Sequence, residues 1–98
     1  MKLPPRTYQE KFNQQHGRCY YCGTNLNFCK VEIDHKVPFS LSRDGRKSNL
    51  CLTCSTCNRM KSNMSQREFH EVMMNRHPAK LIRGMFYYQF INIGKYYE

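Results

Sequence analysis

Cys54-Ser55-Thr56-Cys57-Asn58-Arg59-Met60-Lys61 contains two cysteines at the same spacing as those of Cys19-Tyr20-Tyr21-Cys22. Two Cys-x-x-Cys pairs are typical of a tetrahedral zinc site, in which each pair contributes two thiolates from one turn. With sulfur in all four positions, no coordination site stays open for a substrate or water. The pattern therefore predicts a structural Zn²⁺ held by Cys19, Cys22, Cys54 and Cys57.

Two further cysteines need a separate interpretation. Cys51 stands three residues before Cys54 and could form the second pair with it. Strand alternation argues against this pairing, because it places Cys51 inside a strand, before the turn that holds Cys54 and Cys57. We therefore expect Cys29 and Cys51 to be free thiols that act as small packing residues.

The charge of the chain indicates its class of partner. The 98 residues include 16 Lys and Arg against 7 Asp and Glu, for a net charge of +9. A chain of this length is expected to form a single domain, residues 1–98, with a limited core for which a metal is a common support. The basic excess favours nucleic acid over a membrane, because no segment combines an apolar stripe with a basic face.

Composition also bears on the compartment. No run approaches the roughly 18 apolar residues of a membrane span, and Met1 to Lys11 lacks the apolar block of a secretory signal. We therefore expect a cytoplasmic protein, in an infected host cell if its source is a phage. In a reducing compartment, six cysteines indicate metal binding rather than disulfides.

Local signals predict an α+β domain with two strands and flanking N- and C-terminal helices. Residues 27–35 are rich in strand formers, and residues 49–53 read as a second short strand. Residues 38–48 are expected to form a loop with a turn at Asp44-Gly45. Helices are expected from Thr7 to His16, from about Asn58 onward, from the capping box Ser65–Glu68 to His77, and, with a strand as the open alternative, within 79–98.

The separation of the two cysteine pairs is the second informative feature. A plain zinc ribbon has about 15–20 residues between its pairs, whereas 31 residues lie between Cys22 and Cys54. The insert contains Asp34-His35 and Asn49, and Asn58 directly follows the last cysteine. The cysteine frame is therefore expected to hold a larger unit than a ribbon loop.

Three segments share a joint pattern: Ile33-Asp34-His35-Lys36-Val37-Pro38, Ser48-Asn49-Leu50 and Cys54-Ser55-Thr56-Cys57-Asn58-Arg59-Met60-Lys61. In their order and spacing they resemble the HNH nuclease family in its zinc-knuckle form. The final Asn is similar to that of the HNH domain of RNA-guided CRISPR nucleases. The resemblance implies a ββα-metal nuclease core over residues 19–61, followed by a C-terminal helical extension over residues 65–98.

The resemblance also implies an activity, the metal-dependent hydrolysis of DNA phosphodiester bonds by nicking or double-strand cleavage. Asp34 and Asn58 offer the hard oxygen ligands that suit Mg²⁺ or Mn²⁺. His35 is expected to be the general base, because histidine accepts protons near neutral pH. By resemblance, Asn49 braces the loop that holds His35. The family's eponymous motif has His at the position of Asn58, and this change favours a harder ion than Zn²⁺ there.

Several interpretations stay open at the level of sequence. Basic residues near the site are candidate phosphate contacts, although a solvated surface explains each one equally well. These residues are Arg43, Arg46, Lys47, Arg59 and Lys61. The rival function is a non-catalytic zinc module that binds nucleic acid or a protein partner. An RNA substrate, a homodimer, targeting by a partner protein and an origin in a phage or mobile element are also open.

Overall fold

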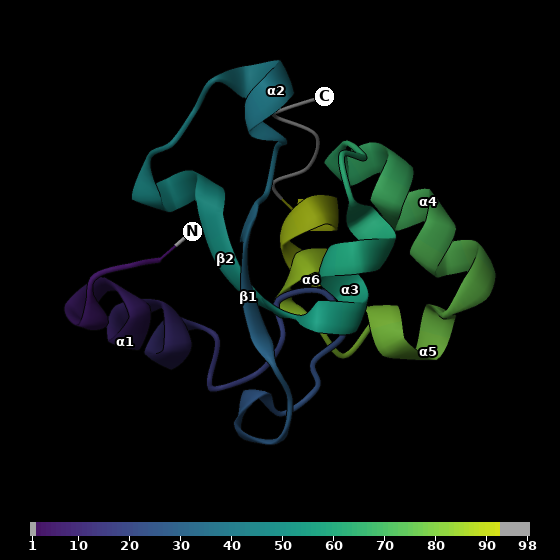
Figure 1. Cartoon of the computed structure of the whole chain (residues 1–98). Helices are drawn as coiled ribbons and strands as arrows, with labels where there is room; N and C mark the ends of the chain where they lie inside the picture. Colours follow the sequence, from purple (N-terminus) through teal and green to yellow (C-terminus); the bar gives the residue numbers. More distant parts are fainter. Residues whose placement is uncertain (1, 93–98) are drawn as a thin grey trace.

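A two-stranded antiparallel sheet lies between the N-terminal helix and the other large helices (Figure 1). The computed structural model describes the backbone of residues 2–92 and the side chains of residues 2–89. Strand β1 (Val31–His35) pairs with β2 (Leu50–Cys54), and the register sets Asp34 opposite Cys51. The architecture is α+β, which confirms the predicted fold class.

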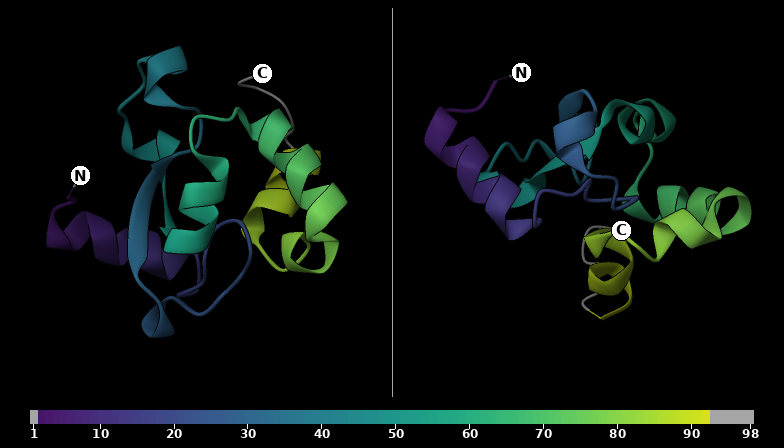
Figure 2. Two further views of the ribbon diagram at one scale, coloured as in Figure 1. Left: turned by 45° about the vertical axis from the view of Figure 1, so that its right-hand side comes forward. Right: turned by 90° about the horizontal axis from the view of Figure 1, so that it is seen from below.

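The helices cover both sides of this sheet. Helix α1 (Pro5–Gln14) packs against β2, and α3 (Ser55–Lys61) packs against both strands from the opposite side (Figure 2). Helices α4 (Gln66–Arg76), α5 (Pro78–Leu81) and α6 (Met85–Asn92) follow on the side of α3. Strand β2 is consequently buried along its whole length.

Two elements begin at other residues than the sequence suggests. Helix α1 begins at Pro5 rather than Thr7, because proline at the first helical position has the required φ and needs no hydrogen-bond acceptor. Helix α3 begins at Ser55, three residues before the expected Asn58, because Cys54 acts as its N-cap and accepts a hydrogen bond from the backbone N–H of Cys57.

The two connections around β1 contain more structure than expected. Residues Leu26–Phe28 form a 3₁₀ turn, η1, whose N-cap side chain accepts a hydrogen bond, so β1 begins only at Val31. The segment between the strands, expected to be a loop, contains the short helix α2 (Phe39–Ser42) and the 3₁₀ turn η2 (Lys47–Asn49).

The C-terminal half is helical. The capping box of Ser65 and Glu68 is confirmed at the start of α4, and this helix ends before Pro78 as predicted. Beyond it the favoured helical interpretation is confirmed as far as Asn92, in the two separate helices α5 and α6. Residues 93–98, which the prediction also covered, lie outside the described residues. Within the described part of the chain, no helix has the length and apolar character needed to cross a membrane.

Tyr21 lies at the centre of the core, although it belongs to the first cysteine turn. Its ring makes edge contacts with Phe69 of α4 and Phe86 of α6, each at 4.9 Å between centroids. Gly84 allows this docking, since a Cβ there would lie 2.3 Å from the carbonyl oxygen of Tyr21. The backbone N–H of Phe86 also donates to the carbonyl of Tyr20 at 3.0 Å. The cysteine turn therefore joins the sheet to the C-terminal helices.

Candidate functional site

The four predicted zinc ligands lie together. The sulfur atoms of Cys19, Cys22, Cys54 and Cys57 all lie within 4.8 Å of one another, and all four residues are buried. The distance from Cys22 Sγ to Cys54 Sγ is 3.8 Å. A tetrahedral Zn²⁺ with Zn–S bonds of about 2.3 Å requires sulfur atoms about 3.8 Å apart. The cluster thus fits the predicted ion in ligand type, number and spacing.

Backbone geometry holds each cysteine pair. In the first turn, the N–H of Cys19 donates to the carbonyl of Thr24 at 2.8 Å, and the positive φ of 74° at Gly23 lets the chain reverse. In the second pair, the Cys57 N–H points at Cys54 Sγ from 3.4 Å. Hydrogen bonding among the four neighbouring thiols lowers the pKa of Cys22 and Cys54 and raises the pKa of Cys19 and Cys57. Binding of a metal would displace the protons that these thiols share.

The other two cysteines lie outside this cluster. Cys51 is buried in β2, and its Sγ lies 3.8 Å from the Tyr21 hydroxyl. Burial is the main cause that raises the pKa of the Cys51 thiol to about 12. Cys29 is half-buried, so neither residue takes a place among the four ligands. The alternative pairing of Cys51 with Cys54 is therefore wrong.

Asp34 is held by two donors that sequence reasoning did not connect with it. The Tyr21 hydroxyl donates to Asp34 Oδ2 at 2.6 Å, and Lys61 Nζ lies 3.3 Å from the same oxygen. Lys61 Nζ also donates to the carbonyl oxygen of His35 at 3.0 Å. Among the described residues, Asp34 Oδ1 has no hydrogen-bond or ion-pair partner. One carboxylate oxygen is thus fixed by the protein and the other is available to a ligand.

Asn49 joins two parts of the connection between the strands. Its side chain is fully buried, its Oδ1 accepts from the N–H of Val37 at 3.0 Å, and its Nδ2 donates to the Val37 carbonyl at 3.0 Å. Nδ2 also donates to the carbonyl of Asp44 at 2.8 Å. These bonds fix the backbone two residues after His35, which is the last residue of β1. The ring of His35 lies 5.6 Å from the ring of Phe39, measured between centroids. Asn58 is half-buried in α3, which packs against β1.

The candidate phosphate contacts fall into two groups. Four of them are exposed: Arg43, Arg46, Lys47 and Arg59. The Arg46 guanidinium forms two 2.9 Å bonds to the Asp44 carboxylate, and this hydrogen bonding lowers the pKa of Asp44 to about 2. Lys61 is the exception, because its side chain is fully buried against Asp34. A surface contact with phosphate does not fit this position of Lys61.

Sequence reasoning missed Tyr21 as a partner of the site. The residue lies between two zinc ligands, and no spacing in the chain connects it with Asp34. Only the turn of the first cysteine pair brings its hydroxyl to β1. Its burial raises its pKa well above the ordinary value for tyrosine, so the hydroxyl stays a donor to the carboxylate.

Comparisons with known proteins agree with this geometry. Residues 19–66 match the family model described as HNH endonuclease. The chain is 41% identical over 46 residues to the CRISPR-associated endonuclease Cas9 of Actinomyces naeslundii, and the match covers 46% of this chain and 4% of that protein. The crystal structure of the Type II-C Cas9 enzyme from Actinomyces naeslundii is similar with a TM-score of 0.59 and 28% identity, over 71% of this chain and 8% of that chain.

This chain therefore spans only a small part of the length of these relatives. Residues 19–66, which the family model matches, include the cysteine pairs, the strand end with Asp34 and His35, and α3. Through residues 19–66, this chain belongs to the HNH endonuclease family.

Proposed function

We propose that this chain is a metal-dependent endonuclease that hydrolyses DNA phosphodiester bonds, with His35 as its general base. The observation that carries the proposal is the difference between the two carboxylate oxygens of Asp34. Its Oδ2 is held by Tyr21 and Lys61, whereas its Oδ1 has no partner among the described residues. Because Tyr21 and Lys61 fix the carboxylate through Oδ2, its Oδ1 is held in place as an oxygen ligand suited to a hard divalent cation.

Asp34 and Asn58 would hold this ion, since both offer oxygen donors and stand on the packed pair β1 and α3. When bound, Mg²⁺ or Mn²⁺ supplies positive charge beside the phosphate and the departing oxygen. His35 would take a proton from the attacking water. Asn49 would keep the backbone after His35 in place through its bonds to Val37. The exposed Arg43, Arg46, Lys47 and Arg59 would contact DNA phosphates.

Cleavage of plasmid DNA tests the proposal. We expect the purified protein to nick or cut plasmid with Mg²⁺ or Mn²⁺, and His35→Ala to lower the rate by about 10²- to 10⁴-fold, because the proton acceptor is lost. DNA affinity and melting temperature should stay close to those of the unchanged protein.

His16→Asn is the control for this experiment. His16 is exposed and has a φ of 55°, a conformation that asparagine tolerates. This variant should cleave at the normal rate. Undiminished cleavage by His35→Ala would refute the assignment of the general base. The same cleavage assay with single-stranded DNA and with RNA identifies the substrate. Analytical ultracentrifugation shows whether the protein forms a dimer.

One observation favours the second function, a non-catalytic zinc module that binds nucleic acid or a protein partner. Lys61 already places a positive charge on Asp34, so the carboxylate is compensated without a divalent ion. Metal analysis separates the two functions. One zinc per chain, with no cleavage in Mg²⁺ or Mn²⁺ and unchanged nucleic-acid binding in EDTA, would support the module.

A further inference from the structure

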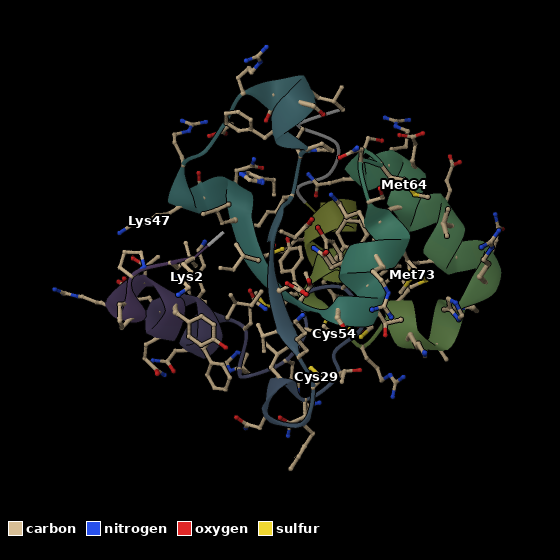
Figure 3. All side chains as sticks on the ribbon, in the orientation of Figure 1. Lys2, Cys29, Lys47, Cys54, Met64 and Met73 are labelled. Atoms are coloured by element: carbon tan, nitrogen blue, oxygen red, sulfur yellow. The ribbon has the colours of Figure 1, made fainter. Side chains whose placement is uncertain are left out.

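A basic cavity lies on the side of α1, away from the zinc cluster. It has a volume of about 380 Å³ and is lined by residues of α1 and η2 and by Lys36, the residue after β1. Three lysines line it: Lys11, Lys36 and Lys47. Figure 3 shows Lys47 extending above α1, at the edge of the molecule. None of these lysines belongs to the metal sites described above.

Lys11 is the unusual member of this group. Lys11 is only 9% exposed as a residue. Its side chain forms no hydrogen bond or ion pair with the described residues. Burial of an ammonium group without a partner is unfavourable. Burial is also the main cause that lowers the pKa of Lys11, and the charge of Lys36 adds to it. The remaining exposed surface of Lys11 opens into the cavity.

The neighbouring charges compensate Lys11 only in part, because burial, Lys36 and Lys47 lower its pKa whereas Cys51 and Glu10 raise it. Lys36 reaches the cavity beside the ring of Tyr20, with Nζ 5.1 Å from the ring centroid. Among the described residues, Glu10 is the one carboxylate that lines the cavity, and it forms no salt bridge with Lys11. The other lining side chains are neutral donors, namely Thr7, Gln14 and Ser48. Three cations with one nearby carboxylate leave the cavity positively charged, and an anion would relieve their repulsion.

We propose that this cavity binds a backbone phosphate of the nucleic acid that the enzyme cleaves, with Lys11, Lys36 and Lys47 as its ligands. This inference rests on the proposed nuclease function. Lys36, which lines the cavity, directly follows His35, the last residue of β1, so one short segment of backbone carries both residues. A second cavity of about 60 Å³ shares Lys11, Gln14 and Lys36 with the first. Two adjoining cavities suit an extended strand better than a small free anion.

Lys11→Met tests the site, because methionine keeps an unbranched apolar stem and removes the charge. The measurement is the affinity of the zinc-loaded protein for a labelled 12-nucleotide DNA without added Mg²⁺ or Mn²⁺, at several salt concentrations, by fluorescence anisotropy. We expect affinity to fall about tenfold at low salt, as for a lost hydrogen bond between charged groups. The slope of log K against log salt should fall by about 0.7 to 0.9, the value for one phosphate contact.

A melting curve of the same variant separates binding from folding. Because the stem of Lys11 is buried and its partly desolvated ammonium group has no hydrogen bond or ion pair, Lys11→Met should melt at the same or a higher temperature. If Lys11 merely stabilised the fold, its replacement would lower the melting temperature. Lys47→Met is the second variant, since its side chain is exposed and its loss does not disturb packing. It should lower the affinity and the salt slope in the same direction.

Lys80→Met is the matched control, since it removes the same charge. Lys80 is exposed on α5, at the opposite end of the molecule from α1 (Figure 1). This variant should bind DNA like the unchanged protein. Equal affinities for the variants at positions 11, 47 and 80 would overturn the proposal, since each removes one charge.

Two further arms complete the test. Pyrophosphate is the probe for a free anion: if it protects Lys11 from chemical acetylation while DNA does not, the cavity binds small anions and the proposal is wrong. Binding without added Mg²⁺ or Mn²⁺ does not need catalysis, so the two hypotheses can fail separately. Cleavage that survives His35→Ala contradicts the nuclease assignment alone, and normal DNA binding by Lys11→Met contradicts the phosphate site alone.

Discussion

At the scale of single residues, two buried lysines have opposite surroundings. Lys61 has a carboxylate 3.3 Å away and a carbonyl oxygen 3.0 Å away. Lys11 has neither kind of partner among the described residues. The protein therefore supplies partners for the ammonium group of Lys61 but gives that of Lys11 no hydrogen bond or ion pair among the described residues. Burial alone does not distinguish a lysine that stabilises the fold from a lysine that binds a ligand. The hydrogen-bond and ion-pair partners of its ammonium group do distinguish the two.

Lys61→Met should destabilise the protein by about 3–5 kcal/mol, the usual cost of removing one member of a buried ion pair. Among the described residues, the change leaves the Tyr21 hydroxyl as the remaining side-chain donor to Asp34 and removes the side-chain donor to the carbonyl of His35. Urea unfolding measures the loss. Lys11→Met is the matched control, and a similar loss in both variants would contradict the distinction between the two lysines.

At the scale of elements, the first cysteine turn connects three parts of the structure. Its cysteines contribute to the metal cluster, its Tyr21 hydroxyl fixes Asp34, and its backbone accepts a hydrogen bond from the start of α6. Gly84 makes the last contact possible, since it lies directly against the carbonyl groups of the turn. Displacement of α6 would therefore affect the position of Asp34 through Tyr21.

Gly84→Ala should destabilise the protein by about 3 kcal/mol, because the new methyl group would overlap the carbonyl oxygen of Tyr21. Thermal unfolding followed by circular dichroism measures the change. Gly45→Ala is the control, since its Cβ would meet only the Phe39 ring at 3.7 Å. We expect that control to stay within about 0.5 kcal/mol. Equal stability of both variants would show that α6 does not dock tightly on the turn.

At the scale of the whole molecule, the cluster of four cysteines supplements a small hydrophobic core. The four ligands belong to the same buried cluster as Tyr21, Phe69 and Phe86. Bound metal would connect the turn before β1 with the start of α3, two segments far apart in the chain. Removal of the ion should thus loosen the sheet, α3 and the candidate nuclease site together.

Alkylation of the cysteines tests this role of the metal. In the zinc-loaded protein iodoacetamide should modify Cys29 alone, because four thiols are ligands and Cys51 is buried with a pKa raised to about 12. After removal of zinc by a chelator, all six cysteines should react as the fold opens. Intact mass spectrometry counts the adducts. A chelated protein that still gains a single adduct would show that the fold does not need the metal.

The predicted parts of the fold are those set by local chemistry. The capping box of α4 was predicted because its hydrogen bonds join residues three positions apart. The start of α3 was misplaced because a cysteine sulfur, instead of a hydroxyl or carboxylate, caps it. The clustering of the four cysteines was predicted because their paired spacing fits one ion. Lys61 was misjudged as a surface residue because its partner is 27 positions away in the sequence.

The sequence by itself determined the family, the cysteine frame and the residues that could bind a divalent ion or accept a proton. Each of these rests on residue type and spacing, which the linear chain displays directly. Only the tertiary structure decided which oxygen of Asp34 is free, that Tyr21 and Lys61 fix the other one, and that Lys11 opens into a cavity without a partner. The physical reason is that hydrogen bonds and desolvation depend on distances of a few ångströms, which folding sets between distant residues.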